Sequence, residues 1–367
     1  MFLSYVPSRV FNAAGAHEAI RDEARGGFAA IDEIRSKKAV LYWTSRTGRH
    51  GSRLAKPPEC DDPRPMTFSR RDLFSRLLTP DKPAPRPVPA PTPTPAPPPV
   101  EATPAARPRR GSTQVEHIPV MWVAPRKETQ PARLALWLSG GIAGMNASGR
   151  ELDALADAGF TAISFDSWQR GTRAPESMAA FYPRMIENFP QVAWPIYGNS
   201  ALETLRVLDW AAEEFGIEPP FYLGGYSAGG DIVVAAAGLD PRIGCVAAIC
   251  ATPDWRRPGM HAEGELVGPG KPDAYAQWLY DRINPLTHAD AYAHRPAIAF
   301  ECGADDDHVP PDGAQRFREA LLAGPYAASP ERIRVSLHAG IRHEYTPEMW
   351  NACLAWFRQH AEPDKPG

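Results

Sequence analysis

A serine at the centre of a short glycine-rich segment could carry out nucleophilic chemistry. Residues 225–229 read Gly-Tyr-Ser-Ala-Gly, so Ser227 is flanked by two glycines. An apolar run at 221–223 precedes the segment, and an Ala/Val-rich run at 232–237 follows it. A strand, a sharp turn and a helix in this order lift a serine Oγ above a sheet, and the helix N-terminus favours a developing negative charge. Ser227 is the candidate nucleophile, and a plain glycine-rich turn is the alternative.

Two later segments supply the base and the carboxylate that a serine nucleophile needs. Residues 297–310 form an apolar run that ends in a glycine and a cluster of acids, and residues 333–347 form a second run that ends in a histidine-bearing loop. Reactive groups in open α/β sheets lie beyond the carboxyl ends of strands. Asp306 and His343 fall at such positions and follow Ser227 in the order serine, acid, histidine. The three residues together predict an acyl-transfer site.

Each assignment has neighbours of the same chemical type. Asp305 and Asp307 flank Asp306, His308 and His338 compete with His343, and Cys302 lies near the acid cluster. We expect the neighbouring acids to face solvent or cap the loop. We expect the histidine next to the acids to lie on the wrong side of them, and the strand histidine to be satisfied within its strand. The thiol is expected to be buried and inert.

These segments resemble the α/β-hydrolases of the dienelactone-hydrolase and prolyl-oligopeptidase branch, especially its small bacterial carboxylesterases. The resemblance covers roughly residues 115–362. It rests on the serine segment, on residues 134–144, and on the blocks Asp166-x4-Gly171-x-Arg173, Gly303-x-x-Asp306-x-x-Val309-Pro310 and Gly340-x-x-His343-x-x-Thr346-Pro347. It implies that Asp306 and His343 complete a triad with Ser227. It also implies that Asp166 and Arg173 form a structural pair.

The resemblance further implies two backbone donors for the oxyanion of acyl transfer. One is the N–H of Ala228, the residue after the candidate nucleophile. The other comes from the loop after residues 134–138, where this chain has Ser-Gly-Gly-Ile at 139–142 and the family usually has a histidine in place of the serine. We expect the second donor to be the N–H of Gly141, with Ile142 as the alternative.

The apolar runs and the segments between them predict the fold class. Seven runs of strand length lie between residues 118 and 338, separated by helix-like stretches. This alternation predicts an α/β fold with a mostly parallel central sheet and helices on both faces, and the resemblance implies that it is the α/β-hydrolase fold. A segment at about 254–295, rich in Trp, Pro and Gly, is expected to form a small cap insertion. Candidate substrate-pocket side chains are Tyr226, Ile142, Trp168 and Trp255, with Trp194 and Trp278 as further aromatic candidates.

The N-terminal third has a different composition from the rest. Residues 1–80 are polar and Arg-rich, and we expect a poorly structured extension in which translation starts at Met1 or at Met66. Residues 81–111 form a proline-rich linker, because alternating prolines favour extended polyproline II. A docking ligand for an aromatic-grooved partner is the alternative for this linker. The catalytic domain is then expected to span 112–362.

Composition narrows the class of protein and its surroundings. The chain has 367 residues, of which 43% are hydrophobic, which suits one large domain plus extra segments. A net charge of −3 gives no reason to expect a nucleic-acid partner. Five cysteines without a Cys-x-x-Cys pattern favour reduced thiols and a cytoplasmic location, with no zinc site. No run approaches the ~20 apolar residues of a membrane helix, and the arginine pair at 70–71 lacks the apolar segment of an export signal.

The sequence predicts a serine hydrolase that cleaves small carboxylic esters. No cofactor or metal is needed, because serine, histidine and backbone amides supply the whole mechanism. The enzymatic alternative is a peptidase or a lactone or thioester hydrolase on the same triad. A non-catalytic binding protein with this fold is the third hypothesis. The sequence leaves open the physiological substrate, its acyl chain length and the oligomeric state.

Overall fold

The computed structural model describes residues 109–127 and 131–361. The chain divides into two units, Met1–Ala105 and Ala106–Gly367, and all described residues belong to the second. The expected extension at 1–80 and nearly all of the expected linker at 81–111 lie outside the described residues. Of the helices within the described ranges, none has the length and hydropathy that crossing a membrane requires.

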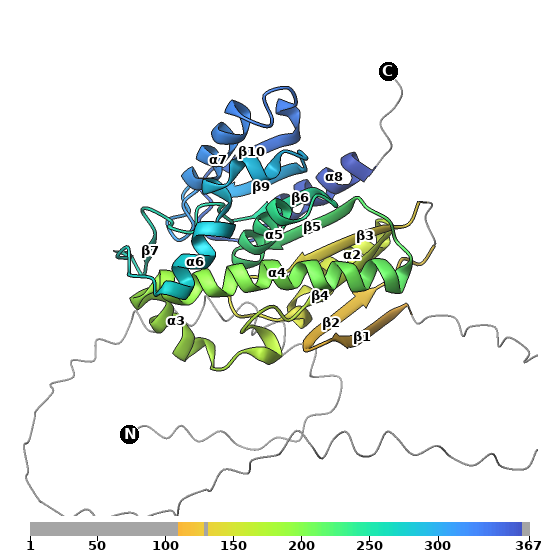
Figure 1. The fold of residues 1–367 in the computed structure, drawn as a ribbon, viewed down its shortest axis with the longest axis horizontal. Helices are drawn as coiled ribbons and strands as arrows, with labels where there is room; N and C mark the ends of the chain where they lie inside the picture. The colour runs from red at the N-terminus through yellow and green to blue at the C-terminus, as the bar shows by residue number, and fades with distance from the viewer. Residues whose placement is uncertain (1–108, 128–130, 362–367) are drawn as a thin grey trace, which may run out of the picture. The chain divides into compact units, whose positions relative to one another are not determined.

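An eight-stranded sheet forms the centre of the described domain (Figure 1). Its strands are β1 (Arg110–Val115), β2 (Ile118–Val123), β3 (Arg133–Leu138), β4 (Phe160–Phe165), β5 (Phe221–Tyr226), β6 (Ile243–Ile249), β9 (Ala297–Gly303) and β10 (Ile333–His338). Their spatial order is β1-β2-β4-β3-β5-β6-β9-β10. β2 pairs antiparallel with both β1 and β4, and every other neighbouring pair in this sheet is parallel. The predicted mostly parallel sheet is confirmed, and β3, β5, β6, β9 and β10 end at one edge.

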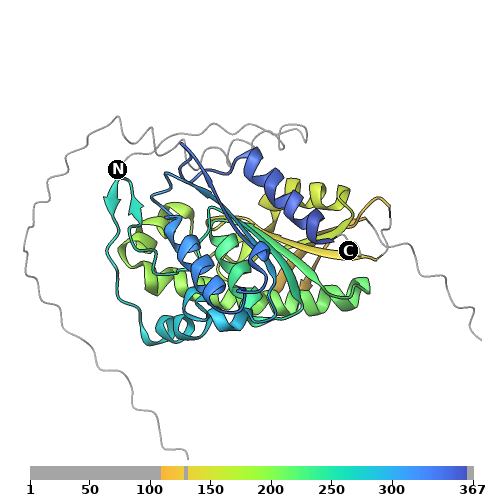
Figure 2. The same cartoon turned by 90° about the horizontal axis from the view of Figure 1, so that it is seen from above.

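Helices cover both faces of this sheet (Figure 2). One face carries α2 (Gly149–Asp157) and α8 (Pro347–Ala361), and the other carries α3 (Met178–Glu187), α4 (Phe189–Phe215), α5 (Ala228–Leu239), α6 (Ala274–Ile283) and α7 (Asp312–Ala323). Each face has its own apolar core. Every residue of β4 and β9 is buried, as expected for strands covered on both sides. This burial explains why these strands read as continuous apolar runs.

Three features of the fold differ from the sequence prediction. β1 begins at Arg110, ahead of position 112 where the domain was expected to start. α4 spans Phe189–Phe215, longer than any helix-like stretch that the sequence analysis delimited, and Pro190 lies in its first turn, where the missing N–H costs nothing. α3, which the sequence analysis did not predict, precedes α4 and buries Phe181 and Met185.

The predicted insertion at 254–295 contains α6 and the small hairpin of β7 (His261–Ala262) and β8 (Glu265–Leu266). α6 packs on α4, where the rings of Trp194 and Tyr280 stack with centroids 4.3 Å apart. The hairpin lies beside the acid-bearing loop, because the His261 N–H donates to the Asp307 carbonyl at 2.6 Å. The insertion is therefore anchored on α4, and its hairpin borders the predicted site.

Candidate active site

Ser227 occupies the sharp turn between β5 and α5. Its backbone angles, φ 52° and ψ −123°, lie in a region that residues other than glycine rarely adopt. The Ser227 N–H donates to the Ile249 carbonyl at 2.8 Å, which holds the turn on the end of β6. A Cβ on Gly225 would lie 2.4 Å from the Gly229 backbone, and a Cβ on Gly229 would lie 2.3 Å from the Leu138 carbonyl oxygen. The close approach of α5 to β5 and β3 therefore requires both glycines.

The structure brings Ser227, His343 and Asp306 into one chain of hydrogen bonds. His343 Nε2 lies 3.0 Å from Ser227 Oγ, and His343 Nδ1 lies 2.7 Å from Asp306 Oδ2. Asp306 Oδ1 accepts the backbone N–H groups of His308 at 3.0 Å and of Val309 at 2.8 Å. The Asp306 carboxylate is fully buried, whereas the His343 side chain is 10% exposed. In such a chain the imidazole can take the serine proton while the carboxylate fixes its tautomer.

The two acids beside Asp306 have other partners. Asp307 forms an ion pair of 2.6 Å with Arg342, and both side chains are exposed. Asp305 is exposed, and its backbone N–H donates to the Ile341 carbonyl at 2.9 Å. Both arrangements agree with the expectation that these acids face solvent or hold the loop.

The competing histidines also have distinct positions. His338 Nε2 lies 2.8 Å from Glu301 Oε2, so this histidine is satisfied by a strand carboxylate. The His308 ring lies edge-on to the His343 ring with centroids 4.9 Å apart. Burial lowers the pKa of His308 to about 3, with the nearby His343 and Arg257 acting in the same direction. His308 is therefore a neutral neighbour of His343, closer to the candidate site than the sequence suggested.

The loop after β3 passes directly beside the candidate nucleophile. A Cβ on Gly140 would lie 3.2 Å from Ser227 Cβ, and Gly141 has a positive φ of 56°. Within the described ranges, the N–H groups of Gly141, Ile142 and Ala228 have no hydrogen-bond acceptor. An oxyanion on this side of Ser227 would find donors both in the loop and at the start of α5.

Buried polar contacts fix the shape of this loop. The Ser139 hydroxyl, at the position where the family usually has histidine, donates to the carbonyls of Ala143 and Gly144 at 3.1 Å each. The fully buried Arg170 donates to the Ser139 carbonyl and to the Ser167 hydroxyl. Burial lowers the pKa of Arg170 to about 10, which leaves the guanidinium charged at neutral pH. The sequence analysis did not identify Arg170 as a support of the loop.

The predicted structural pair between Asp166 and Arg173 is wrong as a side-chain pair. The Asp166 carboxylate accepts the backbone N–H groups of Met145 at 2.7 Å and of Thr172 at 2.8 Å. Arg173 instead pairs with Glu203 at 2.7 and 2.8 Å, and it reaches only the backbone carbonyl of Asp166, at 2.9 Å. Asp166 and Arg173 therefore stabilise the loops separately. The Asp166 carboxylate binds backbone N–H groups that have no other acceptor among the described residues, and Arg173 binds Glu203 instead.

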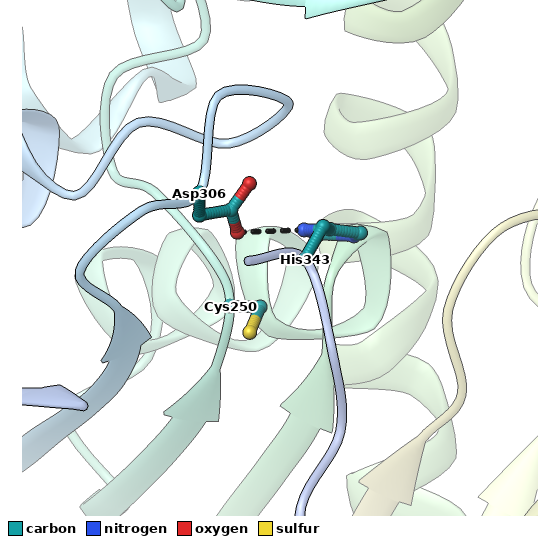
Figure 3. A group of neighbouring side chains, drawn as sticks. All are labelled: Cys250, Asp306 and His343. Atoms are coloured by element: carbon teal, nitrogen blue, oxygen red, sulfur yellow. Dashed lines mark hydrogen bonds and ion pairs between the residues drawn. The ribbon is translucent and has the colours of Figure 1, made fainter. Parts of the chain in front are cut away.

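A thiol that the sequence analysis did not single out, that of Cys250, lies close to Asp306 and His343. Ligand atoms of Cys250, Asp306 and His343 all lie within 4.8 Å of one another (Figure 3). Such a group could in principle hold a metal ion, but burial raises the pKa of the Cys250 thiol to about 12. The thiol also donates to the Glu344 carbonyl at 3.3 Å, next to His343 in the chain. These contacts fit a thiol that packs under the histidine loop better than a metal ligand.

The predicted substrate-pocket residues take different positions in the structure. Tyr226 stacks on His343 with ring centroids 5.5 Å apart, and its hydroxyl lies 3.3 Å from the His343 carbonyl, so it supports the histidine. Ile142 and Trp168 are half-buried against the core. The prediction that Trp255 lines the substrate wall is wrong, since it is fully buried, and Trp194 donates to its carbonyl at 2.7 Å. Trp278 is 47% exposed and lies under Arg282 on α6.

Part of the chain is similar in sequence to a known family and to a curated protein. Residues 198–364, which include Ser227, Asp306 and His343, match the prolyl oligopeptidase family. The chain is 28% identical over 217 residues to Esterase YjfP of Escherichia coli strain K12, a match that covers 56% of this chain and 80% of that protein.

Solved structures show the same fold. TT1662 from Thermus thermophilus superposes with a TM-score of 0.51 at 23% identity, over 70% of this chain and 98% of that one. An acylaminoacyl peptidase from Pyrococcus horikoshii gives a TM-score of 0.52 at 12% identity, over 71% of this chain and 42% of that one. The described domain therefore has the α/β-hydrolase fold and resembles the dienelactone-hydrolase and prolyl-oligopeptidase branch of that fold.

Proposed function

We propose that the protein is a serine hydrolase that cleaves carboxylic esters through Ser227, His343 and Asp306. The observation that carries the proposal is the continuous chain of contacts from Ser227 Oγ through the imidazole to the buried carboxylate, at 3.0 and 2.7 Å. Nucleophile and base lie within hydrogen-bond reach, and the base is oriented by a third group.

Each residue has a defined role in the proposed reaction. Ser227 Oγ attacks the ester carbonyl carbon while His343 Nε2 takes the hydroxyl proton. The N–H of Ala228, together with that of Gly141, stabilises the oxyanion. His343 then gives its proton to the leaving alkoxide, which leaves an acyl group on the serine. Water, activated by the same imidazole, hydrolyses this acyl-enzyme and restores the serine.

The matches with known proteins support a serine hydrolase and favour an ester substrate. The match over most of the length of an esterase supports an ester as the substrate. The match with the prolyl oligopeptidase family keeps a peptidase as the alternative. Ester and amide cleavage share the triad and the oxyanion donors, and they differ in the leaving group that His343 must protonate. The substrate series must therefore decide between the two reactions.

The test compares p-nitrophenyl esters from acetate to octanoate with aminoacyl and peptidyl p-nitroanilides, using wild type and Ser227→Ala in parallel. We expect ester turnover by the wild type and a loss of at least about 10⁴-fold in kcat for the variant. Equal unfolding midpoints would show that the variant is folded. Ester turnover that survives in Ser227→Ala would refute the nucleophile assignment, and serine-dependent turnover of the anilides alone would replace the esterase by a peptidase.

A further inference from the structure

One exposed methionine lies directly beside the candidate oxyanion loop. Met178, the first residue of α3, has 44% of its surface exposed. A Cβ placed on Gly141 would lie 3.0 Å from Met178 Cε, so the methyl end of this side chain lies against the glycine whose N–H is a candidate donor. An apolar side chain at this position contacts water unless a substrate group covers it.

The same helix also reaches the neighbourhood of the candidate base, His343. Tyr182 follows Met178 by four residues, so both side chains lie on one face of α3, about 6 Å apart along the axis. The Tyr182 ring lies 6.4 Å from the His308 ring, and the His308 ring lies 4.9 Å from the His343 ring. The first two turns of α3 therefore extend from the oxyanion loop to the neighbourhood of the base.

The groups on this face carry no charge at neutral pH. Met178 offers a thioether and methyl group, which adapts to apolar partners of different shape. The pKa of Tyr182 is raised by burial and by the nearby Glu263 of the β7–β8 hairpin, so the phenol stays neutral. The negative charge of Glu263 disfavours an anionic group at the same position.

We propose that the Met178–Tyr182 face of α3 binds the apolar part of an uncharged ester and sets its preferred size. This inference rests on the proposed function and deepens it, since it names the substrate as a neutral ester with an alkyl or aryl group larger than methyl. Met178 and Tyr182 act as specificity residues and take no part in proton transfer.

The test measures kcat/KM for two ester series with Met178→Ala and Tyr182→Ala. One series lengthens the acyl chain from acetate to octanoate on p-nitrophenol, and the other enlarges the alcohol of an acetate ester. Matched controls are Leu202→Ala and Tyr275→Ala, which truncate exposed side chains of similar type on α4 and α6.

We expect each α3 variant to lose about 5-fold to 20-fold in kcat/KM on the largest member of one series and less than about 2-fold on the smallest ester. The series that responds identifies the part of the ester that the face contacts. The control variants should keep the wild-type profile. A uniform loss across all esters, or no change in either series, would overturn the inference, because a structural effect does not depend on substrate size.

Failure of the proposed function has a separate signature. If the folded wild type hydrolyses no ester, the esterase proposal fails, and the α3 face is then tested by the rate at which alkyl fluorophosphonates of increasing chain length label Ser227. A chain-length preference that Met178→Ala removes would support the face as an apolar binding surface. Labelling that is absent or independent of chain length would overturn it.

Discussion

Two buried carboxylates of the described domain each lie within 3 Å of a histidine, and the histidine of one pair also lies within hydrogen-bond reach of a serine hydroxyl. His343 and Asp306 are 2.7 Å apart, and His338 and Glu301 are 2.8 Å apart. Glu301 and His338 lie within β9 and β10, whereas Asp306 and His343 lie in the loops that follow these strands. The contact between acid and histidine is nearly the same, so it cannot by itself mark a catalytic site.

The difference lies in the remaining partners of each carboxylate. Glu301 also accepts hydrogen bonds from Arg334 at 2.7 Å and from Ser336 at 3.3 Å, so both of its carboxylate oxygens have partners on β10. The second oxygen of Asp306 accepts two backbone N–H groups of its own loop, and its histidine has a second nitrogen directed at Ser227. The pair of Glu301 and His338, here called the β9–β10 pair, joins two strands. The pair of Asp306 and His343, here called the loop pair, holds the candidate base beyond the carboxyl edge of the sheet.

Removing the charge of each carboxylate should separate the two pairs most strongly. We expect Asp306→Asn to lower kcat by about 10⁴-fold, because the amide favours the wrong imidazole tautomer. Glu301→Gln should change kcat by less than about 3-fold. Steady-state kinetics on one ester measures both, with Asp307→Asn as the control for an exposed acid next to Asp306. A larger loss in Asp307→Asn or in Asp305→Asn would show that the wrong acid was assigned.

The pair of Glu301 and His338 should contribute to stability rather than to activity. Glu301→Gln should lower the free energy of unfolding by about 1–3 kcal/mol, because a buried acceptor of three side chains loses its charge. Urea unfolding followed by tryptophan fluorescence measures this change. An unchanged midpoint would mean that the β9–β10 pair contributes little to the fold.

The Cys250 thiol next to Asp306 and His343 should have a smaller effect on activity than Asp306 itself. Cys250→Ala removes the donor to the Glu344 carbonyl, and we expect kcat to fall several-fold while KM stays within about 2-fold. Cys302→Ala is the matched control, since this buried thiol lies in β9. Equal losses of kcat in both variants would show a general packing effect rather than support of His343.

A further effect concerns the pH dependence of stability and the histidine next to the loop pair, His308. The pKa of His308 is lowered to about 3 in the folded state, so between pH 6.5 and 3 the unfolded chain binds a proton that the folded chain does not. This group therefore reduces stability as the pH falls through that window, by at most about 1.4 kcal/mol per pH unit. In His308→Gln the free energy of unfolding should fall less steeply with decreasing pH than in the wild type, as measured by urea unfolding at pH 4, 5 and 7. An identical pH slope in wild type and variant would contradict the lowered pKa.

Local spacing in the sequence was sufficient for the strands and for the order of the reactive residues. The positions of Ser227, Asp306 and His343 follow from glycines and apolar runs close to them in the chain. The structure brings these three side chains together as that order predicts. It also confirms the mostly parallel sheet, because strands buried on both faces must be apolar throughout.

Contacts between distant segments could not be predicted in this way. Trp255 was expected to line a substrate wall, yet it is fully buried against α4, where it contacts the Tyr197 ring and its carbonyl accepts the Trp194 N–H. Cys250 lies more than fifty residues before Asp306 in the chain, and only the parallel pairing of β6 with β9 brings it close to Asp306 and His343. Met178 and Tyr182 lie in a segment with no recognisable motif.

The sequence by itself determined the fold class, the turn at Ser227 and the order of the three reactive residues, because these depend on local backbone constraints and on apolar periodicity. The tertiary structure showed that Asp306 and His343, rather than their neighbours of the same type, meet the serine, and it alone decided which side chains surround them. The physical reason is that hydrogen bonds of about 3 Å and ring contacts of about 5 Å depend on how loops from separate strands converge at one edge of the sheet.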